Sequence, residues 1–371
     1  MKIKKNKIGF LIISPNWAGT ENALKNIVKS LSKIKVKSVI YCNNEIYNYY
    51  NSIKNVQVYN LGIMNFDSKF RYLNYISMYK VFRKSLLSEE PLILFLMLDV
   101  PLFIACNINK KYKFPIIINL RGEEIDNFLN NKNNLTGFFL KRWLKKSPKI
   151  ISVSQHQIQN LPEKYKNKTI VIPNGVDSKF FKSLKNIKQQ KNIILFVGRI
   201  KKEKGINEIL NISKQLPQYE FWFAGQGPLE SVIKGKNVKN FGFKNKKELI
   251  KLYNQATICI QPSYREGFSN VGLETISCGR ALICTPPFSE YIENGKDGII
   301  IPAKDERALK EAIVDLMENP KKRERIEKNA RKKALRYSWD KVAKMYLRVF
   351  KRLKNNNKNK IYNNGGSEIF K

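Results

Sequence analysis

Short apolar runs alternate with helix-length segments along most of this chain. Because the runs are apolar throughout, both faces of each strand are expected to be covered, as in a parallel sheet flanked by helices. Segments of helical length, such as Glu21–Leu31 and Phe66–Leu87, separate the runs. The first series of predicted strands comprises Ile8–Ile13, Ser38–Tyr41, Leu92–Leu98, Pro115–Asn119, Ile150–Val153 and Ile170–Ile172. The pattern predicts an α/β fold built on a doubly wound parallel sheet.

A second series of strands begins after residue 191. The segment 178–191 is rich in lysine and lacks a clear strand, so we predict a linker there. The second series of predicted strands comprises Ile193–Val197, Glu220–Ala224, Val238–Phe241, Thr257–Gln261, Ala281–Cys284 and Gly298–Ile301. With 371 residues, 43% of them hydrophobic, the chain is long enough for two cores. We expect domains over residues 1–177 and 192–338, with a ligand in the cleft between the carboxyl ends of their strands.

The residues after the second series divide into a helix and a tail. The segment from about 339 to 354 is amphipathic, which predicts a helix that the second sheet does not need. Residues 355–371 are rich in Asn, Lys and Gly, and we expect them to be disordered.

Several classes of site are excluded by composition. His156 is the single histidine, which excludes a histidine-based metal site and any Ser-His-Asp triad that does not use it. The five cysteines include no C-x-x-C pair, which favours a reducing cytoplasm over a disulfide scaffold. No D-x-D spacing is present to hold a metal ion, and the longest apolar run, residues 91–108, contains Asp99 and Pro101. We expect a cytoplasmic protein without a metal site or a membrane-spanning segment.

The net charge of the chain is strongly positive. Its 69 Lys and Arg residues against 30 Asp and Glu residues give +39 at pH 7. This surplus indicates an anionic partner, either nucleic acid or an anionic membrane surface, but the joint abundance of Lys, Asn and Ile also fits a low-GC genome. Segments 66–84 and 138–146 mix aromatic residues with cations, as lipid-binding helices do, although amphipathic helices also pack on their own sheet. No nucleic-acid-binding module is recognisable, so we expect no nucleic-acid partner.

Two carboxylates eight positions apart are the main chemical signal of the second series. Glu266 follows a predicted strand on a loop that continues into Gly267, whereas Glu274 lies about two turns into a helix that ends at Gly279. A carboxylate accepts hydrogen bonds and donates none. Two of them facing one cleft therefore suit a ligand covered with hydroxyl groups, which predicts a sugar.

A cationic loop precedes this pair in the same predicted domain. Gly198 and Arg199 follow the strand Ile193–Val197, and Lys204 precedes a helix that begins near Ile206. Unbonded N–H groups at a helix start attract anions. The guanidinium of Arg199 suits two phosphate oxygens at once, while Lys204 supplies a point charge. A diphosphate neutralised by these two side chains, without a metal ion, is the predicted ligand of this loop.

Four segments, in this order, carry a family resemblance. They are Ile172-Pro173-Asn174-Gly175-Val176-Asp177, Gly198-Arg199 with Lys204-Gly205, Ala224-Gly225-Gln226-Gly227-Pro228-Leu229, and the E-x7-E segment from Glu266 to Glu274. The chain resembles the retaining GT-B glycosyltransferases of family 4 over about residues 8–350. The resemblance implies two Rossmann-like domains, with the nucleotide sugar bound mainly to the second. It also implies that the C-terminal helix crosses back to the first domain.

The same resemblance implies roles for individual residues. Arg199 and Lys204 would hold the diphosphate, and Glu266 would contact hydroxyls of the transferred sugar, so these three are the expected catalytic residues. The ribose, the base, the sugar and the phosphates would be contacted by further donor-site residues, namely Gly19, Phe243, Lys244, Gly267, Phe268, Ser269, Asn270 and Glu274. Transfer would retain the anomeric configuration, with the departing phosphate taking the proton of the acceptor. No cofactor is implied.

Three segments depart from the family pattern. The first glycine loop reads Ala18-Gly19-Thr20-Glu21 instead of carrying a glycine pair, although Gly19 still permits close approach of the backbone to a ligand. The segment Leu120-Arg121-Gly122-Glu123-Glu124 lacks a histidine that the family often has, and we expect Arg121 and Glu123 on the acceptor side. Pro286-Pro287-Phe288-Ser289-Glu290 stands where a glycine-rich loop is frequent.

These features predict a bacterial, metal-independent, retaining glycosyltransferase of the cytoplasm, peripheral on the inner face of the plasma membrane if its basic helices bind lipid. It would move a hexose or N-acetylhexosamine from a nucleoside diphosphate sugar, with UDP-sugar favoured. The acceptor would be a glycan or lipid-linked glycan in surface polysaccharide, lipopolysaccharide or glycoconjugate synthesis. The alternatives are a GT-B nucleotide-sugar epimerase and a basic nucleic-acid-binding protein.

Overall fold

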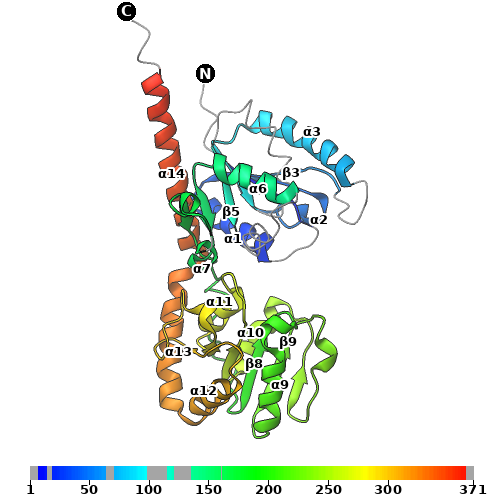
Figure 1. Cartoon of the computed structure of the whole chain (residues 1–371), viewed down its shortest axis with the longest axis vertical. Helices are drawn as coiled ribbons and strands as arrows, with labels where there is room; N and C mark the ends of the chain where they lie inside the picture. Colours follow the sequence, from blue (N-terminus) through cyan, green and yellow to red (C-terminus); the bar gives the residue numbers. More distant parts are fainter. Residues whose placement is uncertain are drawn as a thin grey trace, which may run out of the picture. The chain divides into compact units, whose positions relative to one another are not determined.

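A computed structural model of the protein describes residues 7–14, 19–63, 71–97, 115–120, 135–159 and 161–364. The chain divides into two compact units (Figure 1). Unit 1 comprises Met1–Pro173 together with Trp339–Lys371, and unit 2 is the continuous segment Asn174–Ser338. Each unit is built on one parallel sheet with helices on its faces, as the apolar strand pattern predicts.

The described strands of unit 1 have the order β3-β2-β1-β4-β5-β6-β7, and all their pairings are parallel. These strands are β1 (Lys7–Ile12), β2 (Lys37–Cys42), β3 (Val56–Asn60), β4 (Ile93–Met97), β5 (Ile116–Leu120), β6 (Ile150–Ser152) and β7 (Thr169–Val171). Its described helices are α1 (Gly19–Lys33), α2 (Asn44–Tyr47), α3 (Arg71–Glu89), α6 (Leu135–Lys146), α7 (Gln155–Ile158), α8 (Glu163–Lys166) and α14 (Trp339–Asn364).

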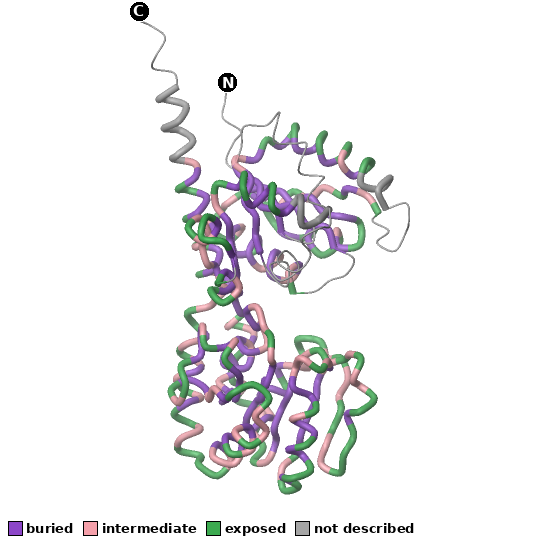
Figure 2. The backbone as a smooth tube through the Cα atoms, in the orientation of Figure 1, coloured by how far each residue is buried: buried purple, intermediate pink, exposed green. Residues whose placement is uncertain are grey.

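Helices cover both faces of the unit 1 sheet. On one face, α3 and α6 bury side chains such as Phe82 and Trp143. On the other face, α1 and α14 do the same, with Leu24 and Tyr346 among the buried side chains. The strands β1, β2, β4, β5 and β6 are consequently buried along nearly their whole length, which appears as purple tube in Figure 2. This double cover explains why their sequences are apolar at consecutive positions.

The C-terminal helix α14 is part of unit 1. Its buried positions, including Val342, Tyr346 and Val349, recur every three to four residues and face α1 and the sheet. The Tyr346 hydroxyl accepts a hydrogen bond from Nδ2 of Asn119 on β5 at 2.7 Å. Asp340 Oδ1 accepts hydrogen bonds from two side chains of α1, Ser30 Oγ at 2.7 Å and Lys33 Nζ at 2.9 Å. Polar and apolar contacts therefore both fix this helix to unit 1.

The helix also runs further than its composition predicts. It continues to Asn364, so ten residues of the segment that we expected to be disordered are helical. Asn and Lys only weaken a helix, and the first glycine pair after Trp339 is Gly365-Gly366. A helix already nucleated on unit 1 can therefore extend through this stretch.

The described strands of unit 2 have the order β10-β9-β8-β11-β12-β13, again all parallel. They are β8 (Ile193–Val197), β9 (Glu220–Ala224), β10 (Val238–Asn240), β11 (Ile258–Gln261), β12 (Ala281–Cys284) and β13 (Ile299–Ile300). Its described helices are η1 (Lys202–Lys204), α9 (Ile206–Gln215), η2 (Glu230–Val232), α10 (Lys246–Gln255), α11 (Asn270–Ser277), η3 (Pro286–Phe288), α12 (Glu306–Glu318), α13 (Pro320–Ala334) and η4 (Leu335–Tyr337). Since β8 and β11 are adjacent, their carboxyl ends bring the loops that follow them to one edge.

Residues 178–191, predicted as a linker, are packed onto unit 2. Phe181 is buried, with its ring 6.1 Å from that of Tyr253. The backbone N–H of Leu184 donates to Oδ1 of Asn254 at 2.7 Å. The segment lacks regular structure, as its sequence indicates, but its apolar residues dock it on α10.

The sequence patterns missed several elements, among them β3 and α13. The edge strand β3 is only half-buried and therefore lacks a continuous apolar run. Helix α13 is so rich in charged residues that its three buried positions, including Ile326, do not stand out. Within the described ranges, no helix combines the length and the apolar character that crossing a membrane requires.

Candidate functional site

Three loops of unit 2 meet at the carboxyl edge of its sheet. They follow β8, β9 and β11, and two of them touch backbone to backbone. A Cβ atom on Gly225, which has φ +155°, would lie 1.8 Å from the carbonyl oxygen of Gly198. The N–H of Ile200 donates to the carbonyl of Gln226 at 2.9 Å. Glycine is therefore required where the β9 loop crosses the cationic β8 loop.

The β11 loop packs against the same cationic segment. Gly205 has φ +72°, and a Cβ atom there would lie 2.6 Å from the carbonyl oxygen of Pro262. The N–H of Tyr264 donates to the carbonyl of Glu203 at 2.8 Å. Two close backbone contacts thus hold the segment that carries Glu266 beside the one that carries Lys204.

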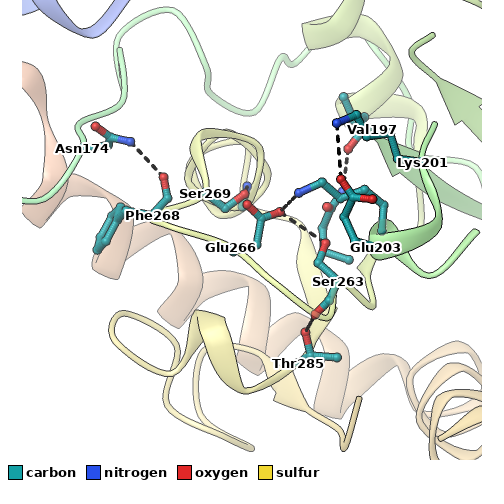
Figure 3. Close-up of polar contacts among 12 residues, drawn as sticks. Asn174, Val197, Lys201, Glu203, Ser263, Glu266, Phe268, Ser269 and Thr285 are labelled. Atoms are coloured by element: carbon teal, nitrogen blue, oxygen red, sulfur yellow. Dashed lines mark hydrogen bonds and ion pairs between the residues drawn. The ribbon is translucent and has the colours of Figure 1, made fainter. Parts of the chain in front are cut away.

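This packing brings Lys204 and Glu266 into direct contact. The Lys204 ammonium lies 2.6 Å from Oε1 of Glu266, and the two side chains are only 18% and 15% exposed. The Ser263 hydroxyl donates to the same carboxylate oxygen at 3.2 Å. The Thr285 hydroxyl in turn donates to the Ser263 carbonyl, as Figure 3 shows. The position of Glu266 is therefore fixed from two sides.

Helix α11 begins immediately after this carboxylate. Ser269 is its N-cap, and the Ser269 hydroxyl accepts from the Gly272 N–H at 3.2 Å. The backbone N–H groups of Gly267, Phe268, Ser269 and Asn270 have no hydrogen-bond partner within the described part of the chain. Such donors at the positive end of a helix dipole are suited to an anion.

Glu274, one turn further along α11, is half-buried beside α10. The Tyr253 hydroxyl donates to its Oε2 at 3.2 Å. Burial raises the pKa of Glu274 to about 7, and the nearby Lys246 and the Tyr253 hydrogen bond limit this rise. At neutral pH, the carboxyl group is therefore present in both protonation states.

The remaining predicted donor residues lie in three places. Arg199 is exposed after β8, and its guanidinium has no partner among the described residues. Phe243 is 70% exposed on the loop after β10, and Lys244 pairs with Glu248 at 3.2 Å. This loop contacts the loop that follows β9, because the Gly242 carbonyl accepts a hydrogen bond from the N–H of Gly225 at 2.8 Å.

Three further predicted residues belong to unit 1. Gly19 is the first residue of α1 and is exposed. Arg121 and Glu123, predicted on the acceptor side, lie outside the described residues.

Sequence reasoning missed several residues that shape the site. The Ser263 hydroxyl donates to the Glu266 carboxylate. The sequence signal for Ser263 was its position in the segment Pro262-Ser263, directly after β11. Tyr291 packs so closely on α11 that a Cβ atom at Gly272 would lie 2.1 Å from the Tyr291 hydroxyl oxygen. The proline-rich segment before Tyr291 forms η3, whose Phe288 also contacts Gly272. No local pattern indicates the contacts of Tyr291 and Phe288 with α11, because these contacts join separate segments of the chain.

The arrangement combines a paired carboxylate, fixed N–H donors and an exposed guanidinium. The carboxylate suits hydroxyl groups, and the N–H groups and cations suit an anion. Among the described residues, no group of three or more His, Cys, Asp or Glu side chains is placed to hold a metal ion. The carboxylate, the N–H groups and the guanidinium together suit a ligand with a hydroxyl-rich part and an anionic part.

Two family models match the chain in adjoining segments. Residues 17–180 match the model described as Glycosyltransferase Family 4, and residues 177–333 match Glycosyl transferases group 1. The chain is similar to an uncharacterized glycosyltransferase of Methanocaldococcus jannaschii, with 27% identity over 92% of this chain and 97% of that protein. It is also similar to GalNAc-α-(1→4)-GalNAc-α-(1→3)-diNAcBac-PP-undecaprenol α-1,4-N-acetyl-D-galactosaminyltransferase of Campylobacter jejuni, with 25% identity over 94% of this chain and 99% of that enzyme.

Solved structures share the two-unit architecture. Sucrose-phosphate synthase from Thermosynechococcus elongatus superposes with a TM-score of 0.79 at 16% identity, over 94% of this chain and 99% of that chain. The HepE protein of Anabaena in complex with UDP-glucose superposes with a TM-score of 0.73 at 16% identity, over 93% and 99% of the two chains. At this identity, the likeness concerns the fold, which is the GT-B arrangement of two Rossmann-like domains.

Proposed function

Because the chain is a GT-B glycosyltransferase of family 4 that uses a nucleotide sugar, we propose that its donor is a UDP-sugar carrying a hexose or an N-acetylhexosamine. The acceptor is a glycan or a lipid-linked glycan. The observation that carries the site assignment is the contact of Lys204 with Glu266 beside the unbonded N–H groups that open α11. This contact supports a donor site in which a group for phosphate lies next to a group for sugar hydroxyls.

Each part of the donor has a counterpart in unit 2. Arg199 and Lys204 neutralise the diphosphate, helped by the N–H groups of residues 267–270. Glu266 exchanges its bond to Lys204 for hydroxyl groups of the sugar. Glu274 accepts from the ribose hydroxyls, and the exposed Phe243 and the neighbouring Lys244 lie beside the base. Gly19 of α1 leaves room for close approach of the backbone to the donor.

The reaction needs a stabilised leaving group more than a base. As the bond between the anomeric carbon and the phosphate oxygen breaks, the electron pair stays on the diphosphate, and the cations and N–H groups stabilise that charge. We propose that the departing phosphate takes the proton of the acceptor hydroxyl on the same face, so that the anomeric configuration is retained. The charge of Arg199 and Lys204 replaces a metal ion in this scheme, and no cofactor takes part.

A thermal-shift panel of UDP-, GDP- and ADP-sugars tests the donor class, because a ligand that binds only the native state raises the unfolding temperature. Stabilisation by UDP-sugars alone is expected. NMR of the products then separates transfer from epimerisation and gives the anomeric configuration. An inverted product, or a free epimerised nucleotide sugar, would remove the retaining-transferase assignment.

A lipid-linked acceptor is supported by the relatives. One of them, from Campylobacter jejuni, acts, by its name, on a chain linked to undecaprenol through a diphosphate. Another relative, from Staphylococcus aureus, is named a capsular polysaccharide biosynthesis glycosyltransferase. We propose a cytoplasmic enzyme that meets such an acceptor at the inner face of the plasma membrane.

The outer surface of α3 and α6 is the proposed membrane-binding face. α3 exposes the apolar side chains Ile76, Val81 and Leu87 between cations. The exposed cations of the two helices are Lys80, Arg83, Lys84, Lys141, Arg142, Lys145 and Lys146. Apolar side chains among cations suit an anionic lipid surface.

The exposed face of α14 supplies a matched control. It carries Lys344, Arg348 and Lys351, but no large exposed apolar side chain among its described residues. In co-sedimentation with vesicles of phosphatidylglycerol and phosphatidylcholine, replacing Lys80, Arg83 and Lys84 by Gln should weaken binding. The same three changes on α14 should weaken it less. Equal losses would point to general charge attraction, and no binding of the parent at low salt would remove the membrane proposal.

A further inference from the structure

Asn174 joins the proposed donor site from the first position of unit 2. Its side chain is buried, with 8% of the residue exposed. Its Nδ2 donates to the carbonyl oxygen of Phe268 at 2.9 Å, across 94 positions of sequence (Figure 3). Since a carbonyl oxygen can only accept, the amide nitrogen rather than the amide oxygen must face it. The contact falls between Glu266 and the start of α11.

This hydrogen bond has a consequence for the next peptide group. A trans peptide is planar, and its C=O and N–H point in opposite directions. No cis peptide bond occurs in the described backbone. Holding the Phe268 carbonyl therefore fixes the direction of the Ser269 N–H, which points away from Asn174. That N–H is one of the unbonded donors of the site, whereas the Ser269 hydroxyl is engaged as the cap of α11.

We propose that Asn174 is a positioning residue that aims the Ser269 N–H at the diphosphate of the nucleotide sugar. The inference rests on the proposed donor site. Charge grows on the leaving phosphate as the glycosidic bond breaks, so a donor whose direction is set beforehand stabilises the transition state more than the ground state. Asn174 itself touches no reacting atom and acts through the Phe268–Ser269 peptide.

The side chain of Phe268 is held independently of Asn174. Its ring centroid lies 4.9 Å from that of Tyr291 and 5.7 Å from that of Tyr337, and the residue is 7% exposed. These contacts keep the loop in place when the Asn174 hydrogen bond is lost. Losing the hydrogen bond therefore frees only the Phe268–Ser269 peptide plane to rotate. An effect on the direction of the Ser269 N–H can thus be distinguished from an effect on folding.

The test compares Asn174→Asp with the parent and with Asn237→Asp. Aspartate keeps the shape of asparagine but cannot donate when ionised. Asn237 is the matched control, because its amide also donates to backbone carbonyls of unit 2, those of Ser213 and Tyr219 at 2.9 and 2.8 Å. It precedes β10 and so lies at the amino end of the strands, opposite the site. Asn174→Ala, which places no acceptor against the Phe268 carbonyl, is the milder variant and carries the same expectation.

UDP affinity is measured by calorimetry, and kcat and KM by transfer from the donor that the panel identifies. For Asn174→Asp, we expect UDP affinity and kcat each to fall by about tenfold, with a smaller change in KM. Asn237→Asp should lower the unfolding temperature but keep UDP affinity and kcat near the parental values.

Two results would overturn the inference alone: parental UDP affinity and kcat in both Asn174 variants, or an equal loss in Asn237→Asp. If the parent shows no measurable affinity for UDP, GDP or ADP, the proposed donor site is overturned instead, and the inference with it. The nucleotide response of the parent thus tells the two failures apart.

Discussion

The ammonium of Lys204 lies 2.6 Å from Oε1 of Glu266, although 62 positions of sequence separate the two residues. In the absence of a ligand, each neutralises the other in a site that is largely shielded from water. In the proposed donor site, a nucleotide sugar offers phosphate oxygens to Lys204 and hydroxyl groups to Glu266. Binding of the donor therefore exchanges one internal ion pair for two ligand contacts.

Glu266→Gln should separate the binding of the transferred sugar from the binding of the diphosphate. We expect transfer to fall by about 10²-fold or more, because the amide is a weaker acceptor for the sugar hydroxyls. UDP, which lacks the transferred sugar, should bind the variant at least as tightly as it binds the parent, since Lys204 no longer has an anionic partner. Calorimetry with UDP and a transfer assay measure the two effects.

Glu203→Gln is the control for that experiment. Glu203 pairs with Lys201 at 3.4 Å in the same loop, and these side chains are 38% and 35% exposed, about twice as much as those of Glu266 and Lys204. An exposed pair contributes little, so turnover should stay near the parental value. A comparable loss in both variants would mean that the general charge of the loop, rather than the Lys204–Glu266 contact, governs transfer.

The pH dependence of stability should report Glu274. Burial raises its pKa to about 7 in the folded protein from 4.5. The folded state therefore holds a proton that the unfolded state has lost between these values. The protonated Glu274 carboxyl therefore contributes to the free energy of unfolding. This contribution is fully present below pH 4.5 and is lost as pH rises through 7, by at most about 1.4 kcal/mol per pH unit.

Urea unfolding at pH 5 and pH 8 measures this effect. The parent should lose more stability between these values than Glu274→Gln, which is neutral at both. The difference between the two proteins cancels the other titrating groups, such as Glu327, whose pKa burial also raises. Identical pH profiles would show that Glu274 is solvated in the folded state.

Gly272→Ala should disturb the start of α11. The added Cβ would lie 2.1 Å from the Tyr291 hydroxyl oxygen and 2.9 Å from the ring of Phe288. We expect a loss of about 1–3 kcal/mol in unfolding free energy, as for other overpacked sites. Removing the hydroxyl with Tyr291→Phe in the same chain should restore part of it. A double-mutant cycle by urea unfolding measures the coupling, and additive effects would contradict the contact.

Tyr346→Phe should weaken the attachment of α14. Its hydroxyl accepts the 2.7 Å hydrogen bond from Asn119, and both residues are buried. Leaving the amide of Asn119 without this partner should cost about 1–3 kcal/mol. Tyr49→Phe, on an exposed residue of the same unit, should change stability by less than about 0.5 kcal/mol. Equal midpoints of urea unfolding for the two variants would rule out a role of this hydrogen bond.

The two sheets were predictable because their strands are buried on both faces, so that runs such as Ile193–Val197 are apolar at every position. The half-exposed β3 has no such run. A shared family pattern predicted that Lys204 and Glu266 serve one donor, but no local signal predicts their direct contact or the contact of Asn174 with the Phe268 carbonyl. Those contacts depend on how separate loops cross, which the close approach of Gly205 to Pro262 illustrates.

The return of α14 to unit 1 has a consequence for the growing chain on the ribosome. Unit 2 is continuous, so all its residues have been synthesised by Ser338. The face of the unit 1 sheet that α14 covers includes Phe10 and Phe95. It stays uncovered until the residues from Trp339 to Leu353 have been synthesised. Domains usually become complete in the order of their synthesis. Here the domain that begins first is the last to be completed, and its apolar face needs protection for the time in which some 165 further residues are translated, the length of unit 2.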